Sequence, residues 1–404
     1  MNINKSKIIL AILLISSFFL YCFLIIININ INIENQTVEK PENIHLTWQR
    51  DPSTTMTITW QTSFENSGDM VFYDNISRPG YLSSYRNNVS GYNMTYSGAS
   101  GYLHIVELTG LKANTTYFFI CGGQMGYSPE RSFRTLPQNI SNLRFVVGGD
   151  SRTNIGAREN ISKIMAKYNP NFAIHTGDMV EDGRIQWRWD NWFGDVDSNW
   201  VGNNGLTIPI IPVIGNHEQN AINYYSQFVL PGNEMYYSYN LSNNVHISVL
   251  STETDTSGEQ LIWLENDLSR HQNFTWKFVT FHQPAIPGSR ENGHSGARNN
   301  WVPLFDKYHV DMIFNGHDHI YLRTFPINLT HSEDPQSFDN GTVHIITGGW
   351  GAPLYEPGTH WYDAYTERPS VYHFCVINIY NNNTLNLQAV NSQENVFDEL
   401  WIRK

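Results

Sequence analysis

Hydrophobic and polar positions alternate in short blocks along most of the chain, and five apolar blocks are followed directly by Asp, Asn or His. Apolar runs of four to six residues bounded by Gly or Pro are typical of buried strands. The polar residues therefore stand at the carboxyl ends of predicted strands, where open α/β sheets place their active sites. The five blocks are residues 145–150, 172–178, 210–218, 278–282 and 310–319.

Helical spacing appears between these predicted strands. Residues 157–168 and 259–270 have apolar positions three and four residues apart, for example Leu261, Leu264 and Leu268 on one face. After residue 319 the pattern returns to strands at 343–347, 374–379 and 384–390. This alternation predicts sheets flanked by helices.

Residues 40–137 have an all-β pattern. Short strands are predicted at 45–48, 56–60, 70–73, 102–106 and 116–120, with Gly, Asn and Ser between them, as in a small sandwich. The region holds no candidate site. We interpret it as a scaffold or homodimer-contact module, with residues 136–139 as the linker.

The N-terminal segment predicts entry into the secretory pathway. Lys5 and Lys7 precede an uncharged apolar run from Ile8 to Ile27, which matches the ~20 apolar residues that cross a bilayer. We favour an uncleaved signal anchor within residues 1–35 over a cleaved signal peptide, which usually has a shorter core. The positive residues would stay cytoplasmic and leave the rest lumenal or extracellular; a cleaved signal would give a secreted protein. Asn-x-Ser/Thr sequons throughout the chain predict N-glycans on that side.

Composition narrows the classes of protein. The chain has 404 residues, 41% of them hydrophobic, which is enough for two cores. Its net charge of −12, with Lys and Arg scattered, disfavours nucleic acid as a partner. Outside the apolar run only Cys121 and Cys375 remain, so they form one disulfide or stay as two buried thiols.

The residue types at the strand ends favour a metal site. Asp, Asn and His without Cys suit Mn, Zn or Fe, and they are too many for one ion with open positions. In a two-metal site the ions lie about 3.5–4 Å apart and share a hydroxide that attacks phosphorus. The two ions stabilise both the attacking and the leaving oxygen of the phosphoryl displacement. The pattern therefore predicts phosphoester hydrolysis.

These blocks, in this order, resemble those of the calcineurin-like metallophosphoesterases, most closely the purple acid phosphatase branch. They read Gly-Asp at 149–150 and 177–178, Gly-Asn-His-Glu at 215–218, Val-Thr-Phe-His at 279–282 and Gly-His-Asp-His at 316–319. The resemblance implies a four-layer α/β (α+β) sandwich over residues 143–400. Residues 108–117 are similar to a fibronectin type III signature, and such a domain precedes the catalytic one in plant-type purple acid phosphatases.

The resemblance also implies roles for individual residues. His217 would contact phosphate and act as the general acid. The first metal would be bound by Asp150 and His319, the bridge would be Asp178, and the second metal would be bound by Asn216, His282 and His317.

Two positions depart from the family pattern. Purple acid phosphatases have a colour-giving Tyr three residues after the bridging Asp, where this chain has Glu181. In relatives without that Tyr, the first block reads Asp-x-His and its His binds the first metal. This chain has Arg152 in the place of that His, and arginine cannot ligate a metal. We therefore expect weaker binding of the first metal and no purple colour.

Three more residues are candidates for the site. Glu181 resembles an acid that holds the catalytic His in the Ser/Thr protein phosphatase branch, so it either orients His217 or is a solvated helix-start residue. Arg152 is either a phosphate contact or a surface loop residue. His294, in a Gly-rich loop, is a candidate substrate contact.

Two functional hypotheses follow. The first is a lumenal or cell-surface phosphatase acting on phosphomonoesters, and also on diesters, by metal-bridged hydroxide attack with His217 as general acid. The alternative is a membrane-tethered, non-enzymatic glycoprotein with a degenerate metal site that acts through its fibronectin-like domain.

Overall fold

The computed structural model describes residues 16–21, 23, 39–65, 68–139, 142–290, 292–329, 341–365, 367 and 369–404. Within these residues, none of the helices has the length and apolarity needed to cross a membrane. Most of the predicted span from Ile8 to Ile27 lies outside the described residues.

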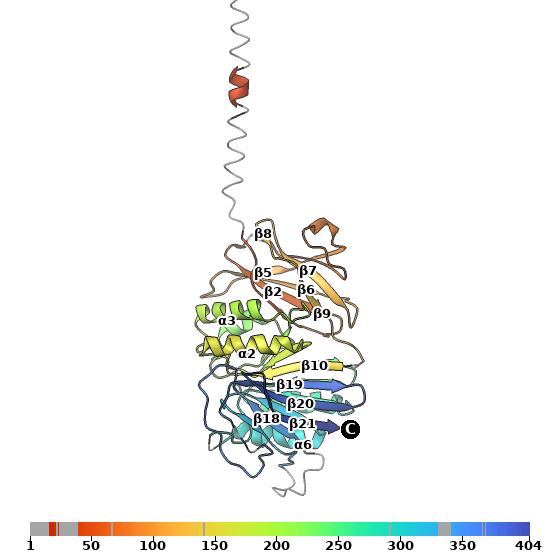
Figure 1. Cartoon of the computed structure of the whole chain (residues 1–404), viewed down its shortest axis with the longest axis vertical. Coiled ribbons are helices and arrows are strands. Elements are labelled where there is room, and N and C mark those ends of the chain that lie inside the picture. Colours follow the sequence, from red (N-terminus) through yellow and green to blue (C-terminus); the bar gives the residue numbers. More distant parts are fainter. Residues whose placement is uncertain are drawn as a thin grey trace, which may run out of the picture.

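The first folded unit is a β-sandwich (orange in Figure 1). One sheet has the order β1-β2-β6-β5, and the other has the order β4-β3-β7-β8, with β9 also paired to β7. Its strands are β1 (Glu42–Thr47), β2 (Met56–Thr62), β3 (Met70–Asp74), β4 (Asn87–Ser90), β5 (Tyr92–Met94), β6 (Tyr102–Leu108), β7 (Thr116–Gly123), β8 (Gly126–Tyr127) and β9 (Arg131–Arg134), and the short helix η2 (Leu82–Ser84) lies between β3 and β4.

The second unit contains two six-stranded sheets. The first sheet has the order β12-β11-β10-β19-β20-β21. Its strands are β10 (Asn142–Gly148), β11 (Phe172–His175), β12 (Ile210–Pro212), β19 (His373–Tyr380), β20 (Thr384–Asn391) and β21 (Val396–Arg403). The second sheet has the order β13-β14-β15-β16-β18-β17. Its strands are β13 (Tyr237–Ser242), β14 (Val245–Val249), β15 (Trp276–Thr280), β16 (Met312–Asn315), β17 (Tyr321–Arg323) and β18 (Val343–Thr347).

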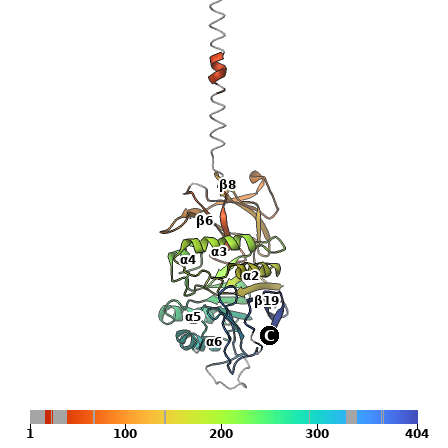
Figure 2. The same ribbon diagram turned by 60° about the vertical axis from the view of Figure 1, so that its left-hand side comes forward.

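Helices cover the outer faces of these two sheets and complete four layers (Figures 1 and 2). The helices of the first sheet are α2 (Ile155–Lys167) and α3 (Gln186–Asn199), followed by the short α4 (Ile222–Gln227). Those of the second sheet are α5 (Gly258–Arg270), η3 (Ala297–Trp301) and α6 (Val302–Tyr308). The predicted four-layer sandwich behind a small all-β unit is therefore confirmed.

The inner strands β11, β14, β15, β16 and β18 are buried along their whole length, as parallel strands covered on both faces should be. In β10, Phe145 packs against Phe278 and Phe314 of the other sheet, with ring centroids 5.8 and 6.2 Å apart. The opposite face of the strand meets α2, since a Cβ added at Gly148 would lie 3.0 Å from Met165 Cε. The apolar runs are continuous because each strand has two faces to bury.

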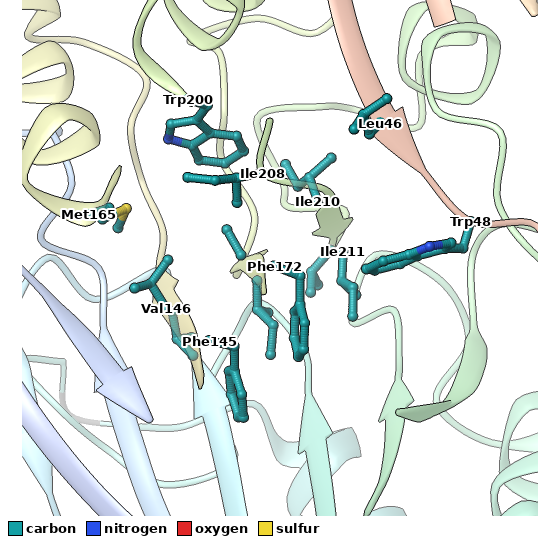
Figure 3. Packing of buried hydrophobic residues seen from close by; sticks show 14 of the residues in the cluster. Leu46, Trp48, Phe145, Val146, Met165, Phe172, Trp200, Ile208, Ile210 and Ile211 are labelled. Atoms are coloured by element: carbon teal, nitrogen blue, oxygen red, sulfur yellow. The ribbon is translucent and has the colours of Figure 1, made fainter. Parts of the chain in front are cut away.

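The two units share one hydrophobic core (Figure 3). Trp48, just after β1, packs edge to face on Phe172 at a centroid distance of 6.1 Å, and its carbonyl accepts a 2.5 Å bond from Tyr239 Oη. His45 stacks on Phe193 of α3 at 4.3 Å. The sandwich is thus packed against the unit that carries the predicted site.

Cys121 and Cys375 are both buried and unpaired, one in each unit. Burial raises the pKa of each thiol to about 12. They are two structural thiols, which was one of the two outcomes that the sequence left open.

Candidate metal centre

Five loops that follow β10, β11, β12, β15 and β16 converge where the two sheets meet. Asp150 and His317 are 167 residues apart in sequence, yet His317 N donates to Asp150 Oδ2 at 2.9 Å. The loops bring together all six predicted ligands, which are Asp150, Asp178, Asn216, His282, His317 and His319.

The first group of donors surrounds His282. Its Nε2 lies 3.2 Å from Asp178 Oδ1, 3.2 Å from Asn216 Oδ1 and 3.3 Å from His317 Nδ1. His317 Nδ1 is also 2.9 Å from Asn216 Oδ1. The candidate ligand atoms of Asp178, His282 and His317 lie within 4.8 Å of one another, a spacing that one ion can span.

Asp150 and His319 form a second group beside the first. His319 Nε2 lies 3.3 Å from Asp150 Oδ1, an atom that is fully buried and has no hydrogen-bond partner in the described part of the chain. A buried carboxylate oxygen without a partner is costly, and a cation bound there would stabilise it. The donor set on this side therefore fits a metal.

Backbone carbonyls fix the tautomer of two of the histidines. His282 Nδ1 donates to the Thr176 carbonyl at 2.8 Å, and His319 Nδ1 donates to the Pro353 carbonyl at 2.6 Å. Each ring then offers the lone pair of Nε2 to the centre, as metal-binding histidines do. Burial alone would lower the pKa of His282, but the Asp178 and Asp150 carboxylates outweigh it and raise that pKa to about 10, so the site attracts positive charge.

Three of these residues have left-handed backbone conformations. The φ angles are 60° at Asp150, 58° at Asp178 and 67° at His317. Such angles are unfavourable for residues with a Cβ and cluster at functional sites. Three of the six predicted ligands therefore stand at strained backbone positions.

His217 lies at the rim of the centre. Its Nδ1 donates to the Glu181 carbonyl oxygen at 2.7 Å, which leaves Nε2 facing Asp178 Oδ2 at 3.8 Å. The side chain is 25% exposed, so a ligand can reach it. An imidazole held in this way can carry a proton on Nε2 toward the centre.

Comparisons with known proteins agree with this geometry. The family model described as calcineurin-like phosphoesterase matches residues 143–321, and the model for the N-terminal domain of purple acid phosphatase matches residues 41–135. The chain belongs to the purple acid phosphatase branch of the calcineurin-like phosphoesterases. It is thus a hydrolase of phosphoric esters.

Several purple acid phosphatases are similar to the chain over most of its length. Purple acid phosphatase 18 of Arabidopsis thaliana is 29% identical over 77% of this chain and 71% of the relative. Acid phosphatase type 7 of Mus musculus is 26% identical over 90% of each chain. The fold matches a purple acid phosphatase from yellow lupin seeds with a TM-score of 0.78 at 19% identity, over 90% of this chain and 74% of that one.

Glu181 and Arg152, which depart from the purple acid phosphatase pattern, are partners of each other. Arg152 Nη1 donates to Glu181 Oε2, and Thr153 Oγ1 donates to the same oxygen at 3.0 Å. Neither alternative for the Glu181 carboxylate describes it: the carboxylate binds Arg152, only the Glu181 carbonyl reaches the His217 ring, and helix α3 begins five residues later, at Gln186. Desolvation opposes ionisation of Glu181, but Arg152 outweighs it and lowers its pKa.

Arg152 is not a surface loop residue. Its side chain is 12% exposed, and Nε lies 3.7 Å from Asp178 Oδ2. The guanidinium therefore stands beside the predicted bridging carboxylate, where it can meet a bound anion.

His294 lies outside the ring of predicted ligands. It lines a cavity of about 310 Å³ together with Arg290, and the cavity reaches His317 and Asp318. His294 Nδ1 accepts a bond from Ala297 N at 3.1 Å, which leaves Nε2 as a donor. Burial lowers the pKa of this histidine.

Glu218 is a residue of the site that the sequence analysis did not single out. It is fully buried, and its carboxylate accepts bonds from Gly215 N at 2.7 Å, Asp178 N at 2.9 Å and Met179 N at 2.8 Å. Burial and the nearby Asp178 raise its pKa to about 8. Its position directly after His217 in the sequence is the signal that could have identified it as a residue of the site.

A second cluster of His246, Asp267 and His271 lies away from the centre. The two rings stack at a centroid distance of 3.8 Å with an interplanar angle of 13°. The lone pairs of an imidazole lie in the plane of the ring. An ion placed between two stacked rings lies outside both planes, so neither lone pair points at it. Ser248 Oγ also donates to Asp267 Oδ2 at 2.7 Å, so we interpret the cluster as a structural network.

Proposed function

We propose that this protein hydrolyses phosphomonoesters, and also phosphodiesters, at a dinuclear centre of Fe, Mn or Zn. The observation that carries this proposal is the convergence of six hard donors, from five separate loops, beside His217. One ion would be held by Asp150 and His319, and the other would be held by Asn216, His282 and His317. Asp178 would bind both ions. Two bound ions would supply Lewis acidity and an activated water for in-line attack on phosphorus.

His217 acts as the general acid in this proposal. The Glu181 carbonyl keeps one proton on Nδ1, so the second proton of the imidazolium is on Nε2, at the exposed side that faces the centre. A leaving alkoxide within hydrogen-bond reach of Nε2 takes that proton. The positive ring also stabilises the charge that develops on the phosphoryl oxygens.

Arg152 binds a phosphoryl oxygen in the same proposal. Glu181 holds the guanidinium against the loop of Asp178, and a planar fork of donors suits phosphate. The alternative of a non-enzymatic glycoprotein is not favoured, because the six donors and His217 are all in place.

The His217→Ala variant tests the role of the general acid. We expect its metal content, measured by elemental analysis, to match that of the parent protein while turnover of phenyl phosphate falls ~10²-fold or more. His309→Asn is a matched control, because His309 is an exposed helix-end residue with φ 53° that Asn also tolerates. Unchanged turnover in His217→Ala would refute the role.

The Asp178→Asn variant tests the proposed bridge. An amide offers one oxygen and no charge, so we expect the purified variant to lose bound metal. Full metal content in this variant would contradict the bridging assignment.

We also propose that the chain is an N-glycosylated protein of the secretory pathway. That it forms a homodimer through its β-sandwich stays a prediction. The apolar run at residues 8–27 and the sequons support this route. Treatment of the protein from its native cells with an N-glycosidase should increase its electrophoretic mobility. An unchanged mobility would argue against lumenal exposure.

A further inference from the structure

We propose that the preferred substrate is a phosphomonoester whose leaving group carries its own oxyanion, a carboxylate or a second phosphate, and that Arg290 binds this group. The inference rests on the proposed phosphomonoesterase function and specifies its substrate class. It comes from the cavity of about 310 Å³ beside the centre, which Arg290 and His294 line.

Arg290 is held in a fixed position relative to the centre. Its Nε lies 3.1 Å from Asp318 Oδ1, and Asp318 Oδ2 accepts a bond from Ser289 N at 2.8 Å. Asp318 is 2% exposed and stands between His317 and His319 in the sequence. The ion pair with this buried carboxylate keeps the guanidinium of Arg290 beside His317.

The Nη1 group of Arg290 becomes available to a ligand when His317 binds a cation. The side chain is 46% exposed, and Nη1 lies against His317 Nε2. A His317 ring that gives the lone pair of Nδ1 to a cation keeps its proton on Nε2. Arginine has donors only and cannot accept that proton, so its Nη groups need another acceptor.

The lining of the cavity favours an anion over a cation. Besides Arg290 it includes the Asn292 amide and His294, whose Nε2 has no partner among the described residues, while the Gln283 amide nitrogen is taken up by Glu253 Oε1 at 2.8 Å. The carboxylate in this lining, Asp318, is already occupied by Arg290 and Ser289 N. A volume of about 310 Å³ is sufficient for one substituted ring, so a leaving group that fills it brings its far end to these donors.

Two pairs of probes test the inference in the metal-loaded protein. The first compares kcat/KM for 4-carboxyphenyl phosphate and for 1,4-phenylene bisphosphate with kcat/KM for phenyl phosphate. We expect at least one charged substrate to be preferred by about tenfold or more, because a site built to bond a charged group discriminates against analogues that lack it. The two arms distinguish a carboxylate from a phosphate.

The second pair measures binding without turnover. Calorimetry should show that 4-carboxybenzylphosphonate or its bisphosphonate analogue binds at least tenfold more tightly than benzylphosphonate. Arg290→Gln should bring both ratios close to one. Arg134→Gln, which removes an exposed arginine of the β-sandwich, should keep them.

Each outcome decides the question. Ratios close to one in the parent protein, or ratios unchanged in Arg290→Gln, would overturn the inference. Failure to hydrolyse all three phosphate esters would refute the proposed function instead, and the calorimetric ratio would then decide the inference by itself.

Discussion

A single buried carboxylate, Glu218, fixes the two loops that carry Asp178 and Asn216. Its oxygens accept bonds from backbone N–H groups of both loops, including Gly215 N and Asp178 N. A Cβ added at Gly215 would lie 2.5 Å from Asp178 N, so the loops have no room to separate or shift. The position of the predicted bridging ligand therefore depends on a residue that need not touch metal or substrate.

We predict that Glu218→Ala destabilises the fold. The substitution leaves the amides of Gly215, Asp178 and Met179 buried without acceptors, at about 1–3 kcal/mol for each group. The free energy of unfolding, measured by urea titration, should fall by about 3 kcal/mol or more. Glu159→Gln, which removes one exposed pair with Lys163, should change it by less than about 0.5 kcal/mol; an equal loss in both variants would contradict the role of Glu218.

At the scale of elements, the loops after β10 and β11 are joined by Arg152 and Glu181. We predict that Arg152→Gln weakens competitive inhibition by inorganic phosphate about tenfold, because a charge-assisted contact is lost. Steady-state inhibition assays measure this effect. Glu181→Gln is the control for loop geometry, since it breaks the same ion pair but keeps the guanidinium; an equal effect in both variants would mean that the pair only supports the loops.

The sequence predicted the strands and their polar ends because both depend on local patterns. The runs before Asp150 and His282 follow from burial on two faces. The spacing of Trp189, Trp192, Phe193 and Val196 also indicates helix α3, for which the sequence analysis expected a helix after Glu181 but gave no bounds. The Arg152 and Glu181 pair could not be predicted, because it depends on how closely two loops approach in the folded chain.

At the scale of the whole molecule, the β-sandwich and the two-sheet unit share a core. We predict that Trp48→Ala lowers the unfolding free energy by about 3–5 kcal/mol, the usual cost of removing a buried Trp. Calorimetry should still show one transition, at a lower temperature. Trp401, which is 56% exposed, provides a matched control as Trp401→Ala; two separate transitions in the parent protein would refute the common core.

Stability should also depend on pH through buried histidines. Burial lowers the pKa of His344 to about 3 and that of His373 to about 4. The unfolded chain takes up these protons near pH 6.5, so the folded state loses stability as pH falls below that value. Each histidine contributes about 1.4 kcal/mol per pH unit until its folded pKa is reached.

His373→Gln tests this dependence. Unfolding free energies measured from pH 7 to pH 5 should fall less steeply in the variant than in the parent protein. The exposed His309→Asn variant should keep the parent slope. Equal slopes in His373→Gln and the parent protein would contradict the assignment of His373 as a buried neutral group.

The strand that precedes Asp150 has one parallel neighbour, β11, and one antiparallel neighbour, β19, which begins at His373. The sheet beneath the centre is therefore incomplete until β19, β20 and β21 have been synthesised. A ribosome-bound chain that has exposed all six predicted ligands would still lack β19, the strand that pairs with β10 just before Asp150. Ion capture is then expected to follow the synthesis of β19, and premature stop codons upstream of β19 are expected to abolish it.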